Sequence, residues 1–473
     1  MAPLSTRCRT RSCRRCGSQR KWHVCTTAAA ATGHHPPDMP PAADPDLISD
    51  LPDELLCAIV SFLPAKDGAH TQALSRRWRP IWPAAALDLE DERDFKAPNI
   101  YGGADLAGVI TRILSAHRGR VRQLRLAGFY YTPTIIDGLF QHPALDKLEE
   151  LHFRYRFVIA QRDPLPLSAL RFSELRVASY GRCRFPKHLG GAVAFPKLRE
   201  LTLYELTISE STLGAMISAC PDLRSMFLRD SVGLDRVCVN SPTLVRLGIV
   251  SPSMEELVVV NAPSMEKLLL FDKYGGPRNV RVMFAPKLEV LGCLSNDMYN
   301  IELQSTVFKK LVAISPIEPL QAVKVFSLTA QDYKLDNVMD FLRCFPCLEK
   351  LYFMPNRSYW KDGYGQMPNG SPSIECLDRH LKEIVLIYYE GSTGGVKFAE
   401  FFAMNARVLK VIEVQLFSDY SKKWKAKQKR LLPKRKYWAS QAAKLNFVHR
   451  AYFGRRVEDS TREMLSYDNP FGC

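Results

Sequence analysis

A six-residue pattern recurs along the middle of the chain and limits the architectures open to it. The pattern is apolar-x-x-apolar-x-apolar, where x is any residue, and it fits twelve times between residues 120 and 415. The copies start at Val121, Leu148, Phe172, Leu198, Leu223, Leu244, Met265, Leu288, Val323, Leu348, Leu381 and Leu409. The first eight follow at steps of 21 to 27 residues, and later steps are longer, with a weaker unit near Phe308. One short strand per period predicts a solenoid of stacked units.

Prolines mark the same units. Seven of them precede or open a unit, and six lie two residues before its first apolar position; they are Pro143, Pro196, Pro221, Pro242, Pro263, Pro286 and Pro346. Proline ends the preceding connection and cannot donate to a strand ladder. Twelve copies in one order also argue against the alternative, a set of unrelated amphipathic strands.

A period in the twenties with one strand per unit matches leucine-rich repeats. A regular repeat has Asn or Cys about eight residues after the first apolar position, and here only Asn296 and Asn356 fall there. We therefore predict an irregular α/β solenoid, with helices or loops of uneven length on its convex side.

Residues 46–90 predict three short helices. Pro52 suits a first turn, and Asp53 and Glu54 favour the positive end of a helix dipole. One apolar stripe at helical spacing then follows, made of Leu55, Leu56, Ile59, Val60 and Leu63. Pro64 ends this helix, a second runs from about Ala65 to Leu74, and Ser75 caps a third that carries Trp78 and Trp82 on one face.

These segments, in this order, resemble the plant F-box/leucine-rich-repeat proteins that end in an FBD domain. The stretch that opens Leu51-Pro52-Asp53-Glu54-Leu55-Leu56 is similar to an F-box over residues 48–89. Residues 342–351 and 374–386, followed by Tyr389-Glu390-Gly391, resemble FBD. The predicted organisation is a disordered basic leader (1–45), a three-helix F-box (46–90), leucine-rich repeats in an α/β horseshoe (91–353), an FBD region (354–420) and a basic C-terminal tail (421–473).

The resemblance implies a non-catalytic adaptor without a cofactor. Its F-box is expected to bind the Skp-type adaptor of an SCF (Skp-cullin-F-box) ubiquitin ligase, and through it a cullin, while the repeats hold an unidentified protein substrate for ubiquitination. The expected adaptor-binding residues are Leu51, Pro52, Leu55, Ile59, Leu63, Leu74 and Trp78, with Trp82 in the F-box interior. Three short helices cannot bury this stripe among themselves, so its excess apolar surface predicts a partner. Gly68 and His70 depart from the family pattern, and Gly inside a helix weakens it by about 1 kcal/mol.

The net charge of +16 comes almost entirely from the two ends, because residues 1–45 carry +5 and residues 421–473 carry +10. Nine of the fifteen residues 422–436 are basic: Lys422, Lys423, Lys425, Lys427, Lys429, Arg430, Lys434, Arg435 and Lys436. This run is interpreted as a nuclear-localisation signal or as a solvated helix or tail. The alternative function is a basic nuclear nucleic-acid-binding protein or a scaffold protein that acts through this tail.

The cysteines do not indicate a metal or catalytic site. Cys13 and Cys16 form a CxxC in the leader, but zinc needs a second pair of ligands that is missing in clear form. The Arg-rich leader also has some character of an organellar transit peptide. Cys344 and Cys347 form a second CxxC at a repeat boundary, where filling of the core is the favoured reading. Thirteen scattered cysteines and no secretory signal favour a reducing compartment, nucleus or cytoplasm, and no apolar run is long enough for a membrane span.

Overall fold

The computed structural model describes residues 47–48, 50–95, 102–156, 162–189, 193–251, 253–270, 276–330, 333, 335–355, 373–416 and 420–449. Contacts divide the chain into two units, Met1–Leu51 and Pro52–Cys473. In the first unit, the Leu51 backbone N–H donates to the Ile48 carbonyl at 3.2 Å. The predicted leader (1–45), its CxxC, residues 356–372 and residues 450–473 lie outside the described residues.

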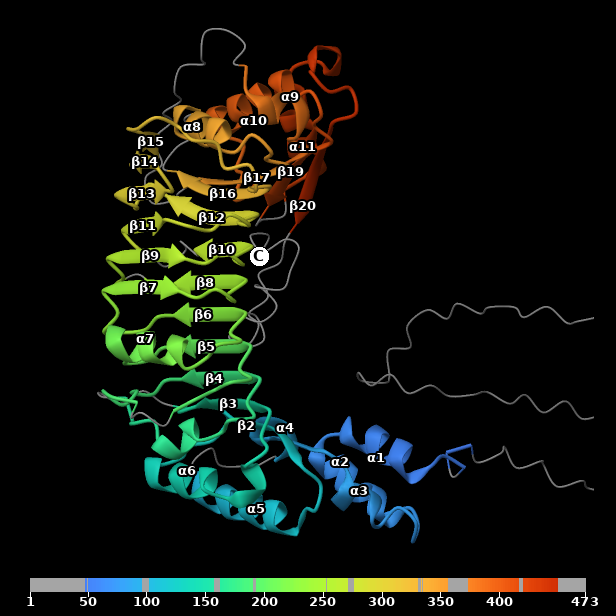
Figure 1. Cartoon of the computed structure of the whole chain (residues 1–473). Helices are drawn as coiled ribbons and strands as arrows, with labels where there is room; N and C mark the ends of the chain where they lie inside the picture. The colour runs from blue at the N-terminus through green and yellow to red at the C-terminus, as the bar shows by residue number, and fades with distance from the viewer. Residues whose placement is uncertain are drawn as a thin grey trace, which may run out of the picture. The chain divides into compact units, whose positions relative to one another are not determined.

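One main sheet runs through the second unit (Figure 1). Its fourteen described strands are parallel to their neighbours and follow chain order. They are β1 (Leu87–Glu90), β2 (Val121–Leu126), β3 (Glu150–Arg154), β4 (Val177–Gly181), β5 (Glu200–Tyr204), β6 (Ser225–Arg229), β8 (Arg246–Val250), β10 (Lys267–Leu270), β12 (Val290–Ser295), β16 (Val325–Ala330), β17 (Lys350–Pro355), β18 (Glu383–Leu386), β19 (Val411–Leu416) and β20 (Lys444–His449). The predicted repeat architecture is therefore confirmed.

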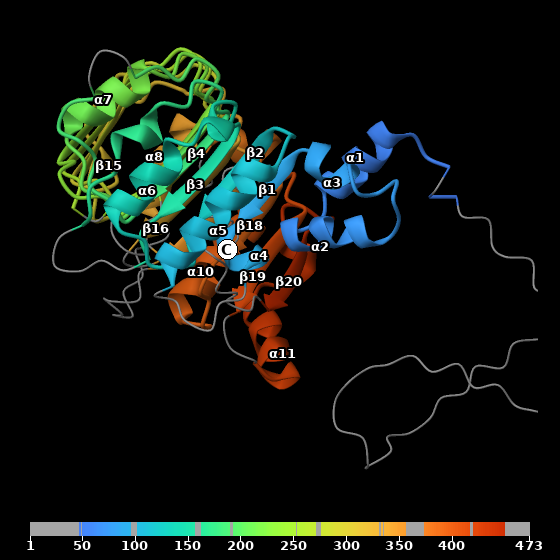
Figure 2. The same cartoon turned by 90° about the horizontal axis from the view of Figure 1, so that it is seen from below.

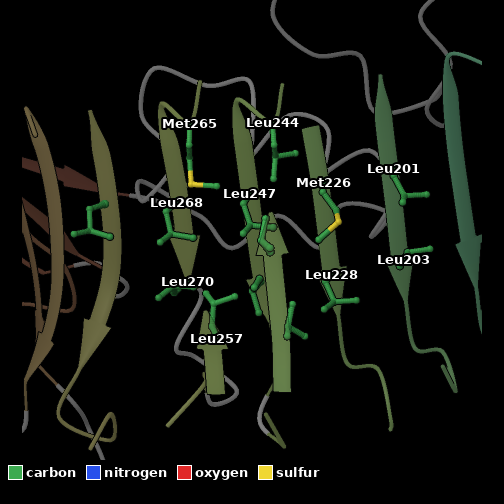
Figure 3. Close-up of a cluster of buried hydrophobic side chains, with 14 of the residues drawn as sticks. Leu201, Leu203, Met226, Leu228, Leu244, Leu247, Leu257, Met265, Leu268 and Leu270 are labelled. Atoms are coloured by element: carbon green, nitrogen blue, oxygen red, sulfur yellow. The ribbon is translucent and has the colours of Figure 1, made fainter. Parts of the chain in front are cut away.

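The apolar positions of the pattern stack in register. Leu201 pairs with Met226, Met226 with Leu247, and Leu247 with Leu268. Figure 3 shows this row beside a second one that contains Leu203, Leu228 and Leu270. All of these side chains are at most 1% exposed. Stacking the repeats thus builds a continuous core that no single repeat could bury.

The prolines of the pattern begin turns. Leu223 N–H donates to the Cys220 carbonyl at 3.1 Å, and Leu348 N–H to the Phe345 carbonyl at 3.1 Å. Pro221 and Pro346 therefore occupy the second position of a four-residue turn, which the fixed φ of proline favours. Each turn delivers the first apolar residue to the core just before its strand starts.

Three details of the repeat prediction are wrong. Ala178 pairs with both Leu151 and Leu201, so the third copy starts at Leu175 rather than Phe172. The apolar residues at both 172 and 175 made the two frames look equivalent. Phe308 lies in a second sheet and adds no unit to the main one. The main sheet also extends beyond the twelve copies, to β1 before them and β20 after them.

A second, six-stranded sheet occupies the return side of the middle repeats, where helices or loops were predicted (Figure 1). Strands β7 (Arg236–Asn240), β9 (Glu256–Asn261), β11 (Asn279–Val282) and β13 (Asn300–Leu303) are parallel, and β14 (Thr306–Lys309) and β15 (Val312–Ala313) are antiparallel. The repeats that carry β7, β9 and β11 advance by only 21 to 23 residues, whereas the repeat that carries β13, β14 and β15 advances by 35. A step of 21 to 23 residues favours an extended return segment over a helix with its two connections.

Helices accompany the longer repeats. They are α4 (Asp91–Asp94), α5 (Gly103–Ala116), α6 (Pro133–Phe140), α7 (Glu210–Ser218), α8 (Asp336–Cys344), α9 (Glu375–Arg379), α10 (Thr393–Asn405) and α11 (Lys422–Leu431), with 3-10 turns η2 (Pro143–Leu145), η3 (Leu167–Leu170) and η6 (Arg435–Tyr437). Thr132, Ser209, Ser392 and Ser421 cap α6, α7, α10 and α11 by accepting a backbone N–H three residues on. No described helix is long and apolar enough to cross a membrane.

The carboxyl-terminal part of the sheet revises the domain limits. Helix α11 and strand β20 lie in the segment predicted as a basic tail from residue 421, and β20 pairs with β19 over six residues. Leu445 and Phe447 pack against the main core. The fold therefore continues to at least His449, because these two apolar residues complete one more unit of the sheet.

Candidate adaptor-binding surface

Helix α1 (Asp53–Ser61) begins directly after Pro52, with Asp53 and Glu54 in its first turn. Its predicted apolar stripe divides into two faces. Leu56 and Val60 are 0% and 2% exposed, so they belong to the interior. Leu55 and Ile59, by contrast, are 51% and 45% exposed. The inner face holds the helix in place, and the outer face is exposed.

The outer face continues past the end of α1. Phe62 is 78% exposed and Leu63 is 36% exposed. Phe62 was not among the predicted site residues, although Leu55, Ile59 and Phe62 follow the i, i+4, i+7 spacing of one helix face. We call Leu55, Ile59, Phe62 and Leu63 the α1 patch. Contiguous exposed side chains of this size mark interaction sites.

The remaining predicted residues come from other elements. Leu74 is 66% exposed and follows the 3-10 turn η1 (Thr71–Ala73). Pro52 is exposed and Trp78 is half-buried. An ion pair between Arg77 and Asp53, 2.9 Å from Nη2 to Oδ1, brings the segment around Trp78 to the start of α1. Leu51 is half-buried and belongs to the first unit.

The third helix is shorter than predicted. Helix α2 (Ala65–His70) starts as predicted but ends four residues before the predicted Leu74 and passes into the 3-10 turn η1. Residues 76–80 form turns, and α3 spans only Ile81–Ala84. Ser75 therefore caps no helix, and Trp78 and Trp82 do not share one. Pro80 is the reason, because inside a helix it would lack an N–H and clash with the carbonyl four residues earlier.

Trp82, which was expected in the F-box interior, is half-buried and explains the unusual glycine of α2. A Cβ at Gly68 would stand 2.6 Å from Cδ1 and 2.7 Å from Nε1 of the indole. The indole also meets the His117 ring edge-on, with centroids 5.0 Å apart. The Gly68 that departs from the family pattern thus makes room for Trp82.

Buried carboxylates join the helical segment to the first repeats. Asp94 Oδ1 accepts the backbone N–H of Ala65, at the start of α2, at 3.0 Å. Asp91 accepts the N–H groups of Ala127 and Gly128 and the hydroxyl of Tyr131 at 3.0 to 3.1 Å. Burial raises the pKa of Asp91, and these hydrogen bonds oppose the rise. The α1 patch is therefore presented on a segment that is fixed to the solenoid.

The described residues include no group of three or more His, Cys, Asp or Glu arranged to hold a metal ion. The second CxxC is split between two environments. Cys344 is buried, which raises the pKa of its thiol to about 12, and Cys347 Sγ donates to Gln321 Oε1 at 3.3 Å. A thiol so rarely ionised is a poor nucleophile.

The predicted nuclear-localisation residues lie on α11 and on the following turn, η6. Eight of the nine basic residues are exposed, and Lys425 is half-buried. Trp424 and Gln428 of the same helix face inward, where Trp424 stacks on Tyr420 at 4.0 Å and Gln428 accepts the Tyr389 hydroxyl at 3.0 Å. The basic run is thus a packed helix for most of its length.

Three family models match the chain in the order of the structural segments. The F-box domain matches residues 48–83, the LRR repeats of the FBD-associated F-box protein At5g56370 match residues 136–353, and FBD matches residues 368–413. The chain therefore carries an F-box, leucine-rich repeats and an FBD segment in the same order as the F-box/FBD/LRR-repeat proteins it resembles. The FBD match spans α9, β18 and α10 and reaches into β19, so in this chain the FBD segment continues the same sheet.

Similar proteins come from Arabidopsis thaliana. The putative F-box/FBD/LRR-repeat protein At5g56810 is 24% identical over 399 residues, which are 79% of this chain and 90% of the relative. The FBD-associated F-box protein At5g56370 is 31% identical over 239 residues, 48% of this chain and 54% of the relative. The putative F-box/FBD/LRR-repeat protein At3g49030 is 25% identical over 405 residues, 78% and 87% of the two chains.

Proposed function

We propose that this F-box protein is the substrate-recognition subunit of an SCF-type ubiquitin ligase. The α1 patch carries the proposal, because four large apolar side chains are displayed together on the F-box while Leu56 and Val60 anchor the same helix from behind. The patch, with Leu51, Pro52, Leu74 and Trp78, binds a Skp-type adaptor and through it a cullin.

The chain's own contribution is positional. The F-box fixes the adaptor at one end of the solenoid, and the repeats bind a protein substrate. Holding the substrate beside a charged ubiquitin-conjugating enzyme raises its effective concentration, so ubiquitin transfer becomes almost intramolecular. The ligase chemistry then needs no catalytic residue from this chain. The proposed location is the nucleus or the cytoplasm, with the α11 run as the candidate nuclear signal.

The test is the affinity of the full chain for a purified Skp-type adaptor, measured by isothermal titration. Ile59→Ala with Leu63→Ala removes half of the α1 patch and leaves Leu56 and Val60 in place. Truncation of such anchors weakens binding by about 2 kcal/mol or more, which is about thirtyfold. Glu54→Ala with Lys66→Ala is the matched control, because both side chains are exposed and polar, and it should bind like the wild type. Equal loss in the control, or no binding by the wild type, would contradict the proposal.

A further inference from the structure

Among the described residues, strand β20 leaves one side of its backbone open. It is the last strand of the main sheet and, among the described strands, pairs only with β19. Lys444 donates its N–H to the Lys410 carbonyl at 2.8 Å, so residues 444, 446 and 448 direct their backbone groups toward β19. Successive residues of a strand alternate in this respect. Leu445 and Phe447 therefore direct their N–H and carbonyl groups toward the open edge.

The edge lacks most of the features that protect a sheet from strand addition. Such edges are blunted by proline, by bulges or by several charged residues. The register of β20 with β19 is unbroken over six residues, and the strand contains no proline and only Lys444 as a permanent charge. Another extended segment can therefore pair with Leu445 and Phe447.

Helix α11 is fixed beside this edge (Figure 2). The rings of Trp424 and Phe447 meet with centroids 6.1 Å apart, and Lys429 Nζ lies 5.9 Å from the centroid of Phe447. Gly391 has φ +82°, and a Cβ there would stand 2.6 Å from Gln428 Nε2 and 2.9 Å from Trp424 Cζ2. Because Gly391 has no side chain, α11 can pack directly against its backbone. The helix is therefore held in one place against the last strands.

The cations of α11 form two rows. Lys422, Lys425 and Lys429 have the i, i+3, i+7 spacing of one helix face, and Lys423, Lys427 and Arg430 have the i, i+4, i+7 spacing of the next. The Phe447 contact of Lys429 puts the first row beside β20. No ion pair joins these six side chains to a described carboxylate, and the helix contains no acidic residue. Their mutual repulsion favours a partner that brings negative charge.

We propose that the open edge of β20, with Lys422, Lys425 and Lys429 beside it, binds an extended acidic peptide segment of a partner protein as an added strand. Backbone hydrogen bonds to Leu445 and Phe447 give the affinity, and carboxylates opposite the lysine row give the selectivity. Identifying this partner as a ubiquitination substrate rests on the proposed function, whereas the binding itself does not.

The probe is a fluorescein-labelled peptide of about twelve residues, in which glutamate alternates with valine, because this length covers the six residues of β20 with room for register. Fluorescence anisotropy with the full chain, without adaptor, measures its affinity. Replacing every glutamate by glutamine removes the negative charge of the peptide, and methylating alternate backbone nitrogens removes its hydrogen bonds to β20. Each change should weaken binding at least about tenfold.

Two protein variants locate the site. Lys422→Gln with Lys429→Gln removes two charges from the row beside β20 and should weaken binding about tenfold. Lys423→Gln with Lys427→Gln removes two charges from the other row and should weaken binding by less than about threefold, because these charges lie farther from β20. The Ile59→Ala/Leu63→Ala variant should bind the peptide like the wild type, so failure of adaptor binding and failure of peptide binding are separate results.

Several results would overturn the proposal. If the methylated peptide binds as tightly as the parent peptide, strand pairing does not contribute to the affinity. If the glutamine peptide binds as tightly as the parent peptide, the carboxylates do not contribute to it. Equal losses in the two lysine variants would indicate attraction to charge without a site. Binding of a single-stranded oligonucleotide of similar charge, with no binding of the peptide, would assign α11 to nucleic acid instead.

Discussion

At the scale of single residues, Gly68 shows how a sequence anomaly becomes a packing requirement. From the sequence alone, a glycine inside α2 is expected to weaken the helix. In the structure, the indole of Trp82 occupies the space that a side chain at this position would need. Gly68→Ala should therefore lower the melting temperature, since overpacking by one methyl destabilises by about 1–3 kcal/mol and outweighs the gain in helix propensity. Gly214→Ala in α7 is the control, because no atom lies within 4 Å of its added Cβ, and it should stabilise. A stabilised Gly68→Ala variant would refute this packing.

Asp91 gives the residue-scale prediction for pH. Because burial raises the pKa of Asp91, the folded chain binds that proton more tightly than the unfolded chain does. The associated stability is present below about pH 4, the unfolded value, and is lost as pH rises through the higher folded value. The melting temperature of Asp91→Asn, measured relative to wild type, should therefore increase between pH 4 and pH 7. A decrease would show that the hydrogen bonds from Ala127, Gly128 and Tyr131 lower the pKa of Asp91 by more than burial raises it.

The exposed site side chains were accessible to sequence reasoning in part. Helical spacing placed Leu55, Ile59 and Leu63 in one apolar stripe with Leu56 and Val60, and only the last two are buried. Periodicity gives the width of an apolar stripe and not the line at which its buried part ends. That line is set by packing against α3, about twenty residues further along the chain, which the local sequence does not record.

At the scale of elements, α11 shows that a run of lysines can belong to the fold. The run was interpreted as a nuclear signal or as a solvated helix or tail, and Trp424 and Gln428 attach it to the sheet. Trp424→Ala should detach it, with a loss of about 2 kcal/mol, less than the value for a fully buried tryptophan. Hydrogen exchange should accelerate in α11 and β20 and remain unchanged in β2 to β6. Tyr437→Ala, which removes an aromatic side chain that is 56% exposed, should change neither.

The second sheet was missed for a different physical reason. The short strands of the main sheet carry their own signal, because Leu and Met recur at core positions in each repeat. The return segments have only their length and their neighbours to decide between helix and strand. Once β7 is extended, β9, β11 and β13 can pair with it in turn, so the choice is cooperative across repeats and absent from any single one.

At the scale of the whole molecule, the order of F-box, repeats and FBD was readable from the sequence because each has its own pattern, and the family models match in that order. The extent of the sheet could not be read from the sequence, because FBD looks like a separate domain there but folds as further repeats of the same sheet. The second unit is a single solenoid, and we propose that it carries an adaptor-binding patch on α1 and a peptide-binding edge at β20.

The most direct test of the central claim is the hydrogen-exchange footprint of a Skp-type adaptor on the full chain. Binding should slow exchange in α1, at Phe62 and Leu63 and around Leu74, and leave β2 to β19 unchanged, because the patch lies on the F-box. A complex whose protection falls on the repeats or on α11, or an adaptor that leaves no footprint, would contradict the assignment of this chain to a ubiquitin ligase.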